Sequence, residues 1–66
     1  MGITIVTGYA IIARSGRVLH ETTNVWTAFR IARRRNAIVE RTDIHGEQTY
    51  MDANAIPVRQ PDLILY

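Results

Sequence analysis

The segment that decides the fold is TTNVWTAFRIARRRN, residues 22–36. It opens with Thr22, Thr23 and Asn24, residue types that cap a helix by accepting hydrogen bonds from its first backbone amides. It closes on Asn36, a residue type that often ends a helix in the left-handed conformation. Apolar residues recur between these ends with helical spacing. The segment therefore predicts one helix, around which the strands are arranged.

One stripe of this helix is apolar. Val25, Ala28, Phe29 and Ala32 follow the i, i+3, i+4, i+7 spacing of a face that packs on a core. The two alanines let a sheet approach closely, and Phe29 is expected to supply most of the apolar volume. We therefore expect these four side chains to face a sheet.

The opposite face of the helix is basic. Trp26, Arg30 and Arg33 follow one another at i, i+4, i+7, and Arg34 adjoins Arg30. Like charges at this spacing repel one another by a few tenths of a kcal/mol, so the cluster favours an anionic partner. A guanidinium group forks onto phosphate or carboxylate, and an indole offers a surface for stacking. Trp26, Arg30, Arg33 and Arg34, called the arginine face below, are thus the first candidate site.

A purely structural explanation of the arginine face stands beside this one. Arginines in the last turn of a helix interact favourably with the negative end of its dipole. All 8 basic residues of the chain are arginine, so each can be a default solvating residue. Trp26 can equally be a rim residue of the core.

Length and composition set further bounds. The 66 residues are enough for one small domain, 1–66, whose core is marginal alone and gains from self-association. The chain has no cysteine, which excludes disulfides and thiolate metal sites. The net charge of +2 is mild, so only the local clustering of arginines argues for an anionic partner.

The segment before the helix predicts a hairpin. Residues 3–14 are apolar on both faces, which indicates a central strand or a strand covered on both sides, and Gly8 suggests a bulge. Gly16 marks a turn between Arg14 and Arg17, and residues 18–22 return as the second strand. A two-residue loop and a three-residue loop with a bulge give registers that differ by one residue, and both remain open.

The chain after the helix predicts a second hairpin. Residues 37–43 and 47–52 are strands joined by a turn at Gly46, and one of Tyr50 and Met51 should enter the core. Residues 52–56 are expected to form one short helical turn that ends before Pro57, and residues 58–61 a connector. The predicted fold class is α+β: a small, mainly antiparallel ββαββ sheet with one helix packed on one face.

The C-terminal residues are strongly apolar. We expect this segment to dock, because leaving it in water would expose a sticky surface. It adds a fifth strand either to its own sheet or to that of a second chain, which would make a homodimer. The residues concerned are Leu63, Ile64, Leu65 and Tyr66.

Catalytic and metal-binding patterns are missing from the sequence. His20 and His45 lack the spacing of a metal-binding pair, and no cofactor motif is present. Ser15, His20 and Asp43 form a nucleophile–base–acid set on paper, but Ser15 lies in a turn with no sign of an oxyanion hole. No apolar run is long enough for a membrane span, and no basic segment precedes the first strand. We therefore expect a cytoplasmic protein that is not an enzyme and contacts no membrane.

Two functions fit these observations. The first, which we favour slightly, is a small basic accessory protein that binds DNA or another nucleic acid through the arginine face, with Arg14 and Arg17 reaching the backbone nearby. The second is a protein-binding inhibitor or adaptor of the kind that phages and plasmids encode against host defence. It would bind an acidic protein surface through the arginine face or pair through an exposed strand edge.

The positions of the carboxylates distinguish these functions. If Glu21, Glu40 and Glu47 lie away from the helix arginines, the basic patch is unopposed and nucleic acid is favoured. If they pair with those arginines, a protein partner or no site at all is favoured.

Overall fold

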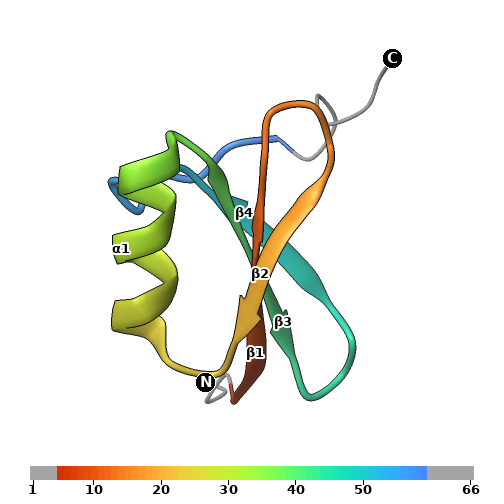
Figure 1. Cartoon of the computed structure of the whole chain (residues 1–66). Coiled ribbons are helices and arrows are strands. Elements are labelled where there is room, and N and C mark those ends of the chain that lie inside the picture. Colours follow the sequence, from red (N-terminus) through yellow and green to blue (C-terminus); the bar gives the residue numbers. More distant parts are fainter. Residues whose placement is uncertain (1–4, 60–66) are drawn as a thin grey trace.

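A computed structural model describes residues 5–59 of the chain. The elements run β1 (Val6–Ile12), β2 (Val18–Thr22), α1 (Val25–Arg35), β3 (Ile38–Asp43) and β4 (Gln48–Met51). The strands form one antiparallel sheet of order β2-β1-β3-β4, and α1 lies on one face of it (Figure 1). The predicted α+β class and ββαββ order are confirmed, and β1 is an inner strand as expected.

The strand order explains the position of the helix. β1 is antiparallel to both β2 and β3, so β2 and β3 run parallel to each other on either side of it. A connection between two parallel strands must cross the sheet, and α1 makes this crossing. The helix therefore lies over β1 and contacts all three strands.

The face of the sheet beneath α1 carries the main core. Ile11 of β1 and Val39 of β3 are fully buried there against Ala28 and Ala32 of the helix. The two alanines have no exposed surface, which confirms that they let the sheet approach closely. Leu19, Phe29 and Ile31 pack around this cluster and are partly buried.

The other face of the sheet carries a second, smaller cluster. Ile12, Ile38 and Tyr50 are buried there, with Ala10 and Val58 packed against them. The expectation that β1 is apolar on both faces is therefore confirmed. Of the pair at the end of β4, Tyr50 is the residue that enters the core.

The first hairpin combines both predicted registers. Next to the turn Ile12 pairs with Val18, which is the register of the three-residue loop. Beyond a bulge at Leu19, Ile11 pairs with His20, which is the register of the two-residue loop. The extra residue in β2 thus changes one register into the other.

Three turns of the chain share one hydrogen-bond pattern, in residues 13–17, 43–47 and 52–56. In each, the first amide donates to the fifth carbonyl and the fourth amide donates to the first carbonyl. The fourth residue has a positive φ in all three, at Gly16 (96°), Gly46 (82°) and Ala55 (66°). This is the pattern of a three-residue hairpin loop.

The prediction of a helical turn at residues 52–56 is therefore wrong. The Asp52 side chain fixes the loop instead, because its Oδ1 accepts from the amides of Asn54 (2.8 Å) and Ile56 (3.0 Å). The chain then returns along β4, where Met51 pairs with Pro57 and the Val58 amide donates to the Tyr50 carbonyl at 3.0 Å. Val58 is thus a partner of β4, not part of a free connector.

Some predictions fall outside the described residues. These are the first residues of the predicted first strand, Ile3 and Thr4, and the C-terminal segment from Leu63 to Tyr66. Within residues 5–59, no helix has the length and apolar character that a membrane span requires.

Candidate functional site

The arginine face lies on a helix whose two ends are fixed by side chains. At the N-terminus, Asn24 Oδ1 accepts hydrogen bonds from the amides of Trp26 (2.9 Å) and Thr27 (3.0 Å). At the C-terminus, Asn36 adopts φ 52° and its amide donates to the Ala32 carbonyl. Both predicted caps are confirmed, and the backbone that carries the arginine face is therefore held at each end.

Arg14 joins the first hairpin to the C-terminal end of α1. Its Nε donates to the Asn36 carbonyl at 3.2 Å and its Nη2 to Asn36 Oδ1 at 3.5 Å. A cation beside the last carbonyls of a helix also complements the helix dipole. Arg14 therefore lies near the last-turn arginines, while Arg17 is exposed at the tip of the same hairpin. Figure 1 shows the hairpin tip and the helix C-terminus at the same end of the molecule.

The arginine face is exposed along its whole length. Arg30, Arg33 and Arg34 are all exposed, and Trp26 has 79% of its surface accessible. Trp26 is therefore not a rim residue of the core. The helical spacing that predicted these residues on one side of α1 is confirmed, although the spacing alone does not assign them a partner.

A groove lies beside Trp26, between α1 and the loop of residues 52–56. Its volume is about 510 Å³. Most of its lining is apolar, and Arg33 and Asn54 add polar groups. The lining residues of this Trp26 groove are Val25, Trp26, Phe29, Arg33, Ala53, Asn54 and Ala55.

Two residues of the predicted core stripe, Val25 and Phe29, line the Trp26 groove. Val25 was expected in the core but is 36% exposed and lines the groove instead. Phe29 is only half-buried, since one side of its ring packs on the core and another lines the groove. The alanines and the sheet residues therefore supply the buried centre. Sequence reasoning missed Ala53, Asn54 and Ala55 because it interpreted their segment as a helical turn.

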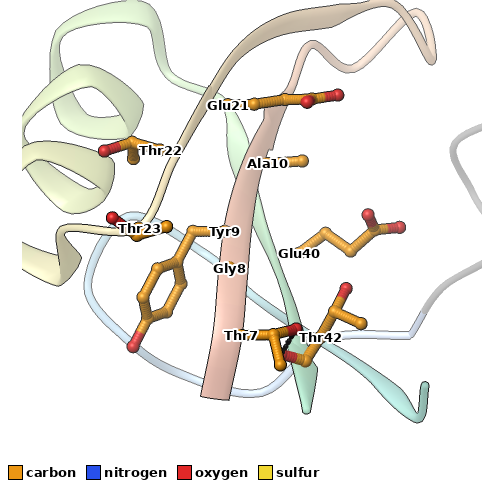
Figure 2. A pocket seen from close by; sticks show the side chains of 9 residues that line it. All are labelled: Thr7, Gly8, Tyr9, Ala10, Glu21, Thr22, Thr23, Glu40 and Thr42. Carbon is orange, nitrogen blue, oxygen red and sulfur yellow. Dashed lines mark hydrogen bonds between the residues drawn. The ribbon is translucent and has the colours of Figure 1, made fainter. Parts of the chain in front are cut away.

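The glutamates lie away from the arginine face. Glu21 and Glu40 are both paired with Ala10 across the strands, and Figure 2 shows all three side chains pointing away from α1. Glu40 Oε2 accepts a hydrogen bond from the Tyr50 hydroxyl at 2.7 Å. Burial, then this bond and the charge of Glu40, raise the pKa of Tyr50 to about 12. Glu47 belongs to the turn at the far end of β3.

A second hollow of about 450 Å³ lies near the end of β2 (Figure 2). It forms where the pairing of β1 shifts between Val6 and Gly8, which confirms the predicted irregularity at Gly8. Two strand spacings, about 10 Å, separate the backbones of Glu21 and Glu40, and Figure 2 shows their carboxylates apart. The lining residues are Thr7, Gly8, Tyr9, Ala10, Glu21, Thr22, Thr23, Glu40 and Thr42.

The catalytic set considered from the sequence does not assemble. Ser15 follows β1 in the hairpin loop, whereas Asp43 pairs with Val6 at the other end of that strand. The length of β1 separates them, which is about 20 Å or more. In the described part of the chain, no three His, Asp or Glu side chains gather as a metal site would require.

Comparison with protein families, curated proteins and solved structures gives no match to this chain. The arginine face and the Trp26 groove are therefore the two candidate sites of the described residues.

Proposed function

We propose that this protein binds nucleic acid through the arginine face of α1, without catalysis. The observation that carries the proposal is the separation of charge. The glutamates that were to decide between the two functions lie on the face of the sheet opposite α1 and in a distant turn, so they do not oppose Arg30, Arg33 and Arg34.

The arginines act as phosphate ligands in this proposal. Each guanidinium group offers a fork of donors that fits two phosphate oxygens. Arg14 and Arg17 extend the basic surface from the helix C-terminus to the hairpin tip. Phosphate contacts position a protein on nucleic acid but carry no sequence information, so we expect little sequence preference from this surface.

Asp52 is the described carboxylate that belongs to the loop beside the arginine face. Its Oδ1 accepts two amide hydrogen bonds within the loop. The loop therefore uses this carboxylate to hold its own backbone, and the arginines remain exposed.

The test is fluorescence anisotropy with a labelled DNA single strand and the corresponding duplex, at about 50 and about 200 mM salt. The double variant Arg30→Gln/Arg33→Gln removes two charges from the arginine face and keeps good helix formers. Arg41→Gln/Arg59→Gln removes the same charge from elsewhere and serves as the matched control. We expect the first variant to bind about tenfold more weakly and its salt dependence to fall by about 0.7 per lost contact on single strands.

Two results would overturn the proposal. The first is no binding of either DNA by the wild type at low salt, where electrostatic contacts are strongest. The second is an equal loss in both double variants, which would show that total charge and not the arginine face matters.

A protein partner is the second candidate, and the exposure of Trp26 is the observation that favours it. Trp and Arg are the most frequent anchors of protein interfaces. This candidate predicts no binding to DNA at low salt and capture of an acidic protein that is lost in Trp26→Ala.

A further inference from the structure

We infer that the Trp26 groove accepts an unpaired nucleobase, so that the preferred ligand is single-stranded nucleic acid. This inference rests on the proposed function and adds the class of nucleic acid. It starts from two features that phosphate binding leaves unexplained, an indole that is 79% exposed and an apolar groove of about 510 Å³ next to it.

The shape and chemistry of the groove fit a base. Trp26 offers a flat aromatic surface at the rim, and Phe29 and Val25 add apolar lining. Stacking on such side chains is the usual way in which proteins hold bases of single strands. A base inside a duplex is already stacked and paired, and therefore cannot offer its face to Trp26.

Polar residues lie beside the groove, where they can contact the phosphates and the base edge of a bound strand. Arg33 lines the groove itself, and Arg30 is one turn from Trp26 on the exposed side of the helix. Along the helix axis Arg30 lies about 6 Å from Trp26 and Arg33 about 10 Å. A base stacked on Trp26 thus places its own backbone along the row of arginines. The Asn54 side chain, with both a donor and an acceptor, lies at the groove and suits the edge of a base.

The groove is held in place before any ligand binds. The Asn24 cap fixes the Trp26 backbone on one side, and the Asp52 hydrogen bonds fix the loop on the other. Because both walls are ordered before binding, less conformational entropy is lost when a ligand binds. The charge of the surrounding arginines selects an anionic ligand for this apolar groove, and single-stranded nucleic acid combines both properties.

The experiment uses the one tryptophan of the chain as its own reporter. Intrinsic fluorescence and anisotropy are measured with a DNA single strand, its duplex, and an abasic strand that keeps the phosphates but lacks the bases. We expect the single strand to quench Trp26 and to bind about tenfold more tightly than the abasic strand or the duplex.

Three variants complete the experiment. Trp26→Ala should lose about tenfold or more in affinity for the single strand and little for the abasic strand, while Trp26→Phe retains part of the affinity. Ile44→Ala, which truncates another exposed apolar residue in the turn at the far end of β3, is the matched control and should bind like wild type. Circular dichroism verifies that each variant is folded.

The outcomes separate this inference from the proposed function. If single strand, abasic strand and duplex bind equally, with no quenching and no effect of Trp26→Ala, base stacking is wrong while phosphate binding stands. If none of the three binds, both proposals fail. If polyglutamate quenches Trp26 as strongly as the single strand, the groove responds to charge alone and the inference fails.

Discussion

Residues 43–47 and residues 52–56 form two loops with the same hydrogen bonds and different sequences. Each starts with an aspartate whose Oδ1 accepts from the third and fifth amides of the loop. Each has a positive φ at its fourth residue, which is Gly46 in one loop and Ala55 in the other. These two loops therefore share the aspartate hydrogen bonds as well as the backbone pattern, and glycine is not required at the fourth position.

Alanine in place of glycine at the fourth position strains the backbone of the loop and adds a side chain to the Trp26 groove. A residue with a Cβ loses about 1–2 kcal/mol in the left-handed region, whereas glycine does not. Ala55 lines the Trp26 groove, while a Cβ added at Gly46 would meet nothing within 4 Å. The strained residue is thus the one whose side chain forms part of the candidate site.

The largest expected effect comes from removing the aspartate of the strained loop. Asp52→Ala deletes the acceptor of two amide hydrogen bonds, so we expect the free energy of unfolding to fall by about 1–2 kcal/mol, as on loss of a helix cap. Urea unfolding measures this value. Asp52→Asn is the control, because its side-chain oxygen can still accept, and it should lose less. An unchanged stability in Asp52→Ala would mean that the backbone alone holds this loop.

Substituting the fourth residue of each loop, as Gly46→Ala and as Ala55→Gly, should change the free energy of unfolding in opposite directions. Gly46→Ala introduces left-handed strain and is expected to lower the free energy of unfolding by about 1 kcal/mol. Ala55→Gly relieves such strain and should raise it by about 0.5–1 kcal/mol, since the freedom of glycine in the unfolded chain offsets part of the gain. Thermal unfolding of both variants tests the pair.

Ala53→Gly is the control for this exchange. It lies in the same loop as Ala55 but has no positive φ and packs against the core, so it should destabilise the protein. Stabilisation by both glycine variants would show that the loop gains from flexibility in general and not from the relief of strain at Ala55.

The smallest expected effect is a pH dependence that comes from Asp43 in the loop of residues 43–47. The hydrogen bond from the Glu47 amide is the main cause that lowers the pKa of Asp43 below its usual 3.8. A carboxylate with a lowered pKa in the folded state contributes stability above its unfolded pKa. This contribution is lost as pH falls through the folded value.

Urea midpoints between about pH 5 and about pH 2 test this effect. We expect Asp43→Asn to show a shallower loss on acidification than wild type. If the urea midpoints of the two proteins fall equally with pH, Asp43 does not contribute to the pH dependence of stability.

The sequence predicted those elements whose signals are local. Asn24 and Asn36 mark the ends of α1 through their own backbone preferences, and both act as caps. Gly16 and Gly46 marked their turns because they readily adopt positive φ. The apolar character of both faces of β1 indicated a central strand, and β1 pairs with β2 on one side and β3 on the other.

The errors arose where the signal was weak or depended on packing. Residues 52–56 lack a glycine, so their loop resembled a helical turn until the hydrogen bonds of Asp52 were seen. The bulge at Leu19, whose side chain packs against the main core, has no mark in the sequence. The arginine face followed from helical spacing, but the groove did not, because its second wall is distant in the chain.

The distribution of charge along the molecule has a consequence for encounter with a ligand. The hairpin arginines and the last turn of α1 lie at one end, and Asp43 and Glu47 lie in the turn at the other (Figure 1). This arrangement is a permanent dipole, which the field of a polyanion rotates before contact. A larger share of collisions then begins with the basic end facing the ligand, and at about 0.1 M salt screening confines this advantage to separations below about 10 Å. If the partner is nucleic acid, as proposed above, the molecule is therefore oriented during diffusion and not only after contact.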